Sequence, residues 1–118
     1  MDGGSRERPL VVRRVGQVID LRPDRIDDYE RLHAATWLGV LKAIHRANIR
    51  NYTIYRHGTR LFASFEYVGD DYAADMSKMA ADPVVQKWWT HTEAMQQPLP
   101  DRKPGSWWTT IPEVFHTD

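Results

Sequence analysis

The sequence contains no cysteine, which excludes disulfide bonds, thiolate catalysis and cysteine-ligated zinc. The absence is compatible with a reducing compartment, and we expect a cytoplasmic protein. An excess of either charge is also missing, because 16 basic residues balance 16 acidic ones. Since binding to a phosphate backbone needs a basic surface, we expect no nucleic-acid partner.

Long hydrophobic runs are missing as well. No stretch of 18 apolar residues occurs, so the sequence predicts no membrane-spanning segment. Residues 1–9 are polar and lack the apolar core of a secretory signal, and we expect them to form a flexible tail. Residues 10–118 have enough apolar side chains for one hydrophobic core but not for two, which predicts a single domain.

Several common functional motifs do not occur. The sequence has no GxGxxG, GxxxxGK[ST] or GxSxG motif. It therefore carries none of these signatures of nucleotide binding or of serine-ester hydrolysis. The five histidines show no HxH, HxxxH or HExxH spacing, and we therefore expect no metal site.

The first half of the chain predicts a strand and then a long helical segment. Residues 10–20 are rich in β-branched side chains, which favours a strand. Pro23 and Asp24 indicate a helix start. From Ile26 to Ile44, apolar and aromatic residues recur every three or four positions, which predicts one helix or two in line, with a kink at Gly39.

The second half predicts a hairpin, two helices and a last strand. The predicted elements are a hairpin over 51–67 with three central residues at 57–59, helices over Tyr72–Ala80 and Val84–Gln96, a loop over 98–105 and a strand at 113–115. This order of strands and helices is typical of a ferredoxin-like α+β fold, with a single antiparallel sheet and helices on one face, of the dimeric α/β barrel type. The other face of such a sheet must be exposed to solvent, covered by a partner or involved in ligand binding.

His33 is the first candidate for chemistry. It lies one helical turn from both Tyr29 and Trp37, so the three predict one helical face. Neutral imidazole can give or take a proton near pH 7. The pattern by itself favours a buried histidine with a satisfied hydrogen bond.

Aromatic residues are the other candidates. Adjacent helical positions point about 100° apart, so only one of Trp88 and Trp89 can face the core fully, and the other lies at an interface or in a pocket. Indole faces suit the C–H surface of a sugar ring. In a strand, Tyr52 faces away from Asn51, and a packing role explains a strand tyrosine more often than a binding role does. For Trp107 and Trp108 we expect a clamp on the C-terminal segment rather than a site.

Taken together, these residues resemble the L-rhamnose mutarotase family across nearly the whole chain after residue 10. The matching motifs are YxxxH at 29–33, the tryptophan at 37, NYxIY at 51–55, LFASFEYVGDD at 61–71, DPVVQKWW at 82–89 and EVFH at 113–116. The chain differs in having Ala35 and Leu38 where many members have proline.

The resemblance implies a ferredoxin-like homodimer that uses neither metal nor organic cofactor and interconverts the anomers of L-rhamnose or a similar deoxyhexose such as L-fucose. It places the acid–base group on His33 and the sugar contacts on Tyr29, Tyr52, Trp88 and Trp89. Two alternatives remain open: a cofactor-free monooxygenase-like enzyme of the same architecture and a non-catalytic sugar-binding module. A sugar pocket needs many polar partners, and the side chains that suit this role are Tyr29, His33, Asn51 and Tyr52.

Overall fold

The computed structural model describes residues 12–118. The predicted flexible tail at 1–9 and the first two residues of the predicted first strand lie outside this range. Within it, no helix combines the length and apolar character needed to cross a bilayer.

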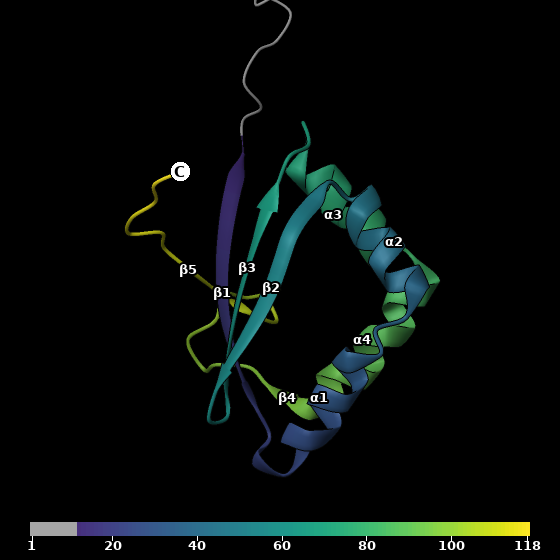
Figure 1. Cartoon of the computed structure of the whole chain (residues 1–118), viewed down its shortest axis with the longest axis vertical. Helices are drawn as coiled ribbons and strands as arrows, with labels where there is room; N and C mark the ends of the chain where they lie inside the picture. Colours follow the sequence, from purple (N-terminus) through teal and green to yellow (C-terminus); the bar gives the residue numbers. More distant parts are fainter. Residues whose placement is uncertain (1–11) are drawn as a thin grey trace, which may run out of the picture.

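In the described part of the chain, five strands form one antiparallel sheet (Figure 1). The strands are β1 (Arg13–Leu21), β2 (Ile49–His57), β3 (Arg60–Tyr67), β4 (Gln96–Gln97) and β5 (Thr109–Ile111). The main order is β2-β3-β1-β4, and β5 also pairs with β1. β4 pairs with the end of β1 and β5 with its middle. The predicted single antiparallel sheet is confirmed.

The four α-helices of residues 12–118 cover the same face of the sheet (Figure 1). After a short 3-10 turn at Pro23–Arg25 come α1 (Ile26–Ala34), α2 (Leu38–Arg46), α3 (Tyr72–Ala80) and α4 (Pro83–Met95). Two aspartates set helix starts: Asp71 accepts a hydrogen bond from the backbone of Ala74, and Asp82 accepts one from Val84. The predicted ferredoxin-like α+β class is therefore confirmed.

The predicted helical segment over 26–44 is two helices set at an angle (Figure 1). The chain leaves the helix at 35–37 without a proline, and the Thr36 hydroxyl donates to the carbonyl of His33 at 2.9 Å. The predicted kink at Gly39 is wrong, because Gly39 lies inside α2. A Cβ atom there would lie only 2.9 Å from Cγ1 of Val84, so the glycine allows α2 and α4 to pack closely.

Two predictions about strands are also wrong. His57 pairs with Arg60, so the hairpin loop has two residues rather than three, and its first, Gly58, has a φ of +60°. The last strand is Thr109–Ile111 rather than 113–115. Its position is set by pairing with β1, and Pro112, which has no N–H to give to a strand ladder, follows directly.

The core lies between the sheet and the helices and consists of two clusters of buried side chains. The first contains Ile19, Leu21, Tyr29, Leu61 and Met95. The second contains Val15, Ala47, Ile49 and Phe65. Each large apolar side chain buried in this way contributes about 1.5–3 kcal/mol to folding. A cavity borders both clusters, so the core is built around a hollow rather than filled throughout.

Candidate active site

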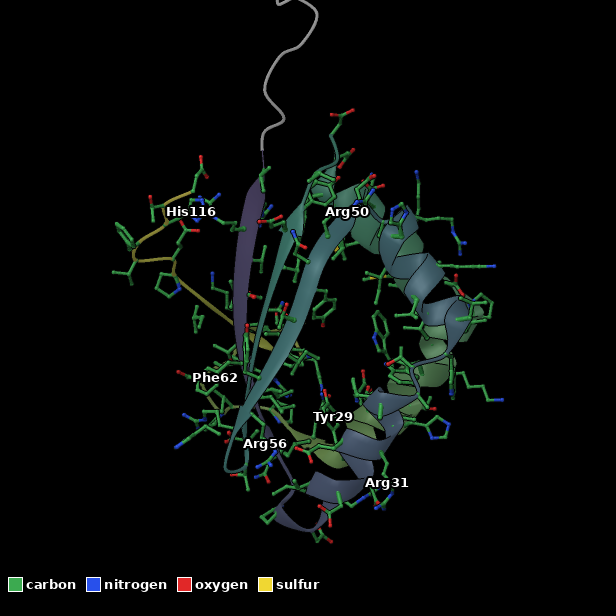
Figure 2. The ribbon with its side chains drawn as sticks, viewed as in Figure 1. Tyr29, Arg31, Arg50, Arg56, Phe62 and His116 are labelled. Carbon is green, nitrogen blue, oxygen red and sulfur yellow. The ribbon has the colours of Figure 1, made fainter. Side chains whose placement is uncertain are left out.

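A cavity of about 410 Å³ lies between the inner face of the sheet and the helices. All five predicted site residues line it: Tyr29 and His33 from α1, Tyr52 from β2, and Trp88 and Trp89 from α4. Figure 2 shows Tyr29 between α1 and the sheet. Residues separated by up to 60 positions in the chain therefore share one enclosed space.

A β-bulge in β2 turns Tyr52 into this cavity. The pairing between β2 and β3 shifts between Arg50 and Thr53, and Asn51 adopts a φ of +53°. Tyr52 packs against the ring of Phe65, whereas the amide of Asn51 donates to Glu66 at 2.8 Å on the opposite side. Tyr52 and Asn51 thus face apart as predicted. The expectation that Asn51 is a polar partner in the sugar pocket is wrong.

The contact between Tyr29 and His33 defines where the imidazole proton sits. Their rings stack with centroids 4.1 Å apart, and Nδ1 of His33 lies 2.9 Å from the backbone carbonyl oxygen of Tyr29. A carbonyl oxygen only accepts hydrogen bonds, so Nδ1 carries the hydrogen. In the neutral ring Nε2 then has a free lone pair. His33 is therefore set up to accept a proton at Nε2.

Burial favours the uncharged forms of His33, Tyr29 and Tyr52. It lowers the pKa of His33 below the usual 6.5, against a smaller opposite effect of the hydrogen bond to Tyr29. It raises the pKa of Tyr29 above its usual range and that of Tyr52 to about 12. Tyr52 is 39% exposed and lines the cavity. An accessible surface that faces the cavity rather than bulk solvent reconciles this exposure with the raised pKa of Tyr52. At neutral pH the site thus holds a neutral imidazole and two intact phenols.

The tryptophan pair divides as predicted. Trp88 is 6% exposed and its ring meets the edge of His33 at 5.2 Å between centroids, while Trp89 is only half-buried. The prediction that Trp37 shares the His33 face is wrong, because the helix ends between them. Trp37 packs behind Trp88 and against His91 and does not line the cavity.

The sequence interpretation missed several cavity residues, among them two tryptophans and a glutamine. Trp107 and Trp108, expected only to clamp the C-terminal segment, both line the cavity, as does Gln96. Gln96 is 2% exposed and bonds to both Trp107 and Tyr29. One signal could have found it: in the predicted helix over Val84–Gln96, Gln96 falls four positions after Thr92 on the core-facing stripe, so it is a polar side chain at an expected core position.

A metal site does not arise from the described part of the chain. Over residues 12–118, no three side chains among His, Asp and Glu are grouped so that they could hold a metal ion. The polar groups that the cavity does offer include an imidazole, phenols, amides, indoles, the Thr92 hydroxyl and the carboxylate of Glu93. These can exchange protons and hydrogen bonds with a neutral ligand.

Comparison with known proteins assigns the family. A family model described as L-rhamnose mutarotase matches residues 14–117. L-rhamnose mutarotase of Phocaeicola vulgatus is 34% identical over 100 residues, covering 83% of this chain and 91% of the relative. L-fucose mutarotase of Xanthomonas campestris is 34% identical over 112 residues, covering 90% and 89%.

A solved structure agrees in fold. The crystal structure of L-rhamnose mutarotase from Formosa agariphila matches 90% of this chain and 99% of its own, with a TM-score of 0.68 and 23% sequence identity. On the strength of the family match and the relatives above 30% identity, the chain belongs to the L-rhamnose mutarotase family and is a sugar mutarotase, an isomerase.

Proposed function

We propose that this mutarotase exchanges the anomers of L-rhamnose or a related 6-deoxyhexose such as L-fucose, with His33 as the acid–base residue and Tyr29, Tyr52, Trp88 and Trp89 as sugar-binding residues. The observation that carries the proposal is the Tyr29–His33 pair, which offers one proton acceptor and one proton donor side by side in a buried cavity. The relatives named for L-rhamnose and L-fucose support this choice of sugar.

Mutarotation needs such a pair. Nε2 of His33 takes the proton of the anomeric hydroxyl as the C1=O bond forms, the bond between C1 and the ring oxygen breaks, and the Tyr29 hydroxyl gives its proton to that oxygen. After rotation about C1–C2 the steps reverse on the other face of the aldehyde, and both protons return. General acid–base catalysis of this kind contributes about 10²–10⁴-fold.

The far end of the cavity supports a deoxy sugar. It is lined by apolar side chains that include Ile44, Ile49, Met76 and Met79. A methyl group fits such a surface, whereas the hydroxyl of a hydroxymethyl group would face mainly apolar side chains there, with the Tyr72 phenol as the nearby polar group. The indole walls suit the apolar face of a pyranose ring. A 6-deoxyhexose has both features.

We also propose a homodimer that uses the outer face of the sheet. Phe62 on β3 and Tyr55 on β2 are 39% and 64% exposed there, and Val114 and Phe115 on the C-terminal segment are 94% and 80% exposed. Figure 2 shows Phe62 on the side of the sheet away from the helices. Exposed apolar groups of this extent mark an interaction surface. Because the chain carries both the segment and the face, two copies can cover each other symmetrically.

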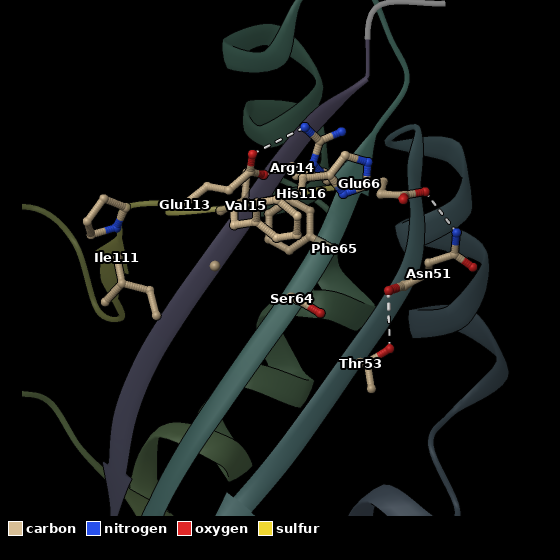
Figure 3. Close-up of a pocket in the computed structure, with 13 residues that line it drawn as sticks. Arg14, Val15, Asn51, Thr53, Ser64, Phe65, Glu66, Ile111, Glu113 and His116 are labelled. Atoms are coloured by element: carbon tan, nitrogen blue, oxygen red, sulfur yellow. Dashed lines mark hydrogen bonds and ion pairs between the residues drawn. The ribbon is translucent and has the colours of Figure 1, made fainter. Parts of the chain in front are cut away.

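The C-terminal segment is attached to the sheet by one charged contact. The guanidinium of Arg14 on β1 donates to Glu113 at 2.7 Å, beside a hollow of about 480 Å³ on the outer face (Figure 3). Such an exposed ion pair contributes little to binding the segment. The segment is therefore available to a second copy.

For the location of the enzyme, we propose the cytoplasm, because a sequence without cysteine is compatible with a reducing compartment.

Exchange NMR on purified protein tests the proposed reaction. We expect faster exchange between the anomer signals of L-rhamnose and L-fucose than in buffer. L-mannose, which differs from L-rhamnose only by a hydroxyl on C6, is the matched control and should exchange more slowly. Sugar binding without faster exchange would contradict catalysis and support a binding module. Equal rates for L-rhamnose and L-mannose would contradict the role of the apolar end.

A further inference from the structure

Gln96 connects Tyr29 to Trp107 in the wall of the cavity. The Trp107 indole N–H donates to Oε1 of Gln96 at 2.8 Å, and Nε2 of Gln96 donates to the Tyr29 hydroxyl at 3.3 Å. The backbone of Gln96 is held by pairing with Leu21 of β1. With 2% of its surface exposed, this side chain has little freedom to move.

The donor and acceptor atoms of Trp107, Gln96 and Tyr29 fix the direction of the hydrogen bonds between them. An indole N–H only donates, so the oxygen of the Gln96 amide must face Trp107. The NH₂ group then faces Tyr29, and because it also only donates, the Tyr29 oxygen accepts. Between residues 12 and 118, the Tyr29 hydroxyl has no protein acceptor of its own. Its hydrogen is thus left for a ligand in the cavity.

We propose that Gln96 and Trp107 are positioning residues that hold the Tyr29 hydroxyl as a proton donor toward the sugar. This inference rests on the proposed function, in which Tyr29 protonates the ring oxygen. Without Trp107 the amide could rotate and offer its oxygen to Tyr29, which would turn the phenolic hydrogen away from the cavity.

The hydrogen bond from Gln96 also stabilises Tyr29 after Tyr29 has given its proton to the sugar. Burial raises the pKa of Tyr29, and the hydrogen bond from Gln96 acts in the opposite direction. A donor held against the phenol oxygen favours the phenolate that exists while the sugar is open. Gln96 therefore acts on the reacting state more than on the binding of the closed sugar, so its loss should lower kcat and leave KM almost unchanged.

A double-mutant cycle on kcat tests the inference. Gln96→Met keeps the approximate size but removes both hydrogen bonds, and we expect kcat to fall on the order of tenfold. In a Tyr29→Phe background the same change should have no further effect, because its target is gone. Gln97→Met is the matched control, since Gln97 is the exposed neighbour and should leave kcat unchanged.

The outcomes separate the inference from the proposed function. An inactive wild type would contradict the proposed function. An active wild type with a folded Gln96→Met variant at full kcat would overturn the positioning role, as would an equal loss in both backgrounds or a fully active Tyr29→Phe variant. If Gln96→Met does not fold, Trp107→Phe is used in the same cycle, because it removes the N–H donor and keeps a six-membered aromatic ring. We expect a smaller kcat loss from it that also disappears with Tyr29→Phe.

Discussion

The two faces of the sheet each carry a hollow, and the hollows differ in how their polar groups are used. On the outer face, Arg14 binds Glu113 and holds the pKa of that carboxyl below its usual range, and Asn51 is bonded to Glu66. These groups are exposed and already paired. On the inner face, burial lowers the pKa of His33, and its Nε2 has no hydrogen.

The comparison shows that size does not identify the active site. The two hollows are similar in volume, about 480 Å³ on the outer face and about 410 Å³ on the inner face. Proton transfer requires groups that are unpaired, protected from water and held in one protonation state. Among residues 12–118, the inner hollow offers Nε2 of His33 and the Tyr29 hydroxyl, which has no protein acceptor, so we propose that the inner face carries the chemistry and the outer face carries assembly. Three predictions test this division.

The largest effect is expected from His33→Gln. Glutamine keeps a hydrogen-bonding shape but cannot take a proton at neutral pH, so kcat should fall about 10²–10⁴-fold while the fold is retained. Anomer exchange measured by NMR gives the rate, and circular dichroism checks the fold. A conservative change of an outer-face histidine, His116→Gln, is the matched control and should leave kcat unchanged. A folded His33→Gln protein with the wild-type rate would remove His33 from the mechanism.

A smaller effect is expected from Trp89→Ala. Trp89 is half-buried and lines the cavity, so its loss removes sugar contact at less cost to the core than the loss of Trp88, which is 6% exposed. We expect KM to rise about tenfold, equivalent to about 1.4 kcal/mol, with a smaller change in kcat. Steady-state exchange rates over a range of sugar concentrations measure both. An unchanged KM would make Trp89 a structural residue.

The smallest effect on catalysis is expected from the outer face. Phe62→Glu combined with Phe115→Ser should prevent dimer formation, because it places charge and polarity where apolar groups meet. Light scattering should change from about twice the chain mass of 13.8 kDa to that mass. Because the five proposed site residues of one chain already share one cavity, kcat should change less than about twofold. Leu41→Glu on α2 also changes an exposed apolar residue, but away from the outer face of the sheet. This control variant should remain dimeric.

A wild-type monomer at micromolar concentration would contradict the proposed dimer. A large kcat loss on dissociation would contradict the separation of the two faces. Either result would mean that the inner cavity is not complete in one chain or that the outer face has another role.

The sequence predicted those features that depend on local patterns. The alternation along β2 placed Tyr52 and Asn51 on opposite sides, and the predicted helices over Tyr72–Ala80 and Val84–Gln96 lie within one residue of the bounds of α3 and α4. The predictions failed where distant contacts decide. The position of β5 is set by pairing with residues 16–18, almost a hundred positions earlier, and not by the apolar pair at 114–115.

The candidate site was also predicted in part, with five of its residues named from the sequence and others not recognised. The family motifs named five residues that the fold brings to one cavity, although their roles stay predictions. Gln96 and Trp107 were not recognised, since the function proposed for them comes from a hydrogen-bond chain between α1, β4 and the segment before β5. The break at 35–37 was also not predicted, because no proline or glycine marks it and Thr36 bonds to the preceding turn instead.

The pH dependence of kcat tests the central claim, that neutral His33 in a buried cavity accepts the proton. Since burial lowers the pKa of His33, the ring stays neutral from alkaline pH down to a value below 6.5 and becomes charged only under more acidic conditions. We predict that kcat for L-rhamnose exchange is constant near neutral pH and falls at acid pH with an apparent pKa below 6.5. The same profile measured with His33→Gln should lose this transition. A wild-type kcat that rises as the pH falls through this range, or the same transition in His33→Gln, would contradict the account.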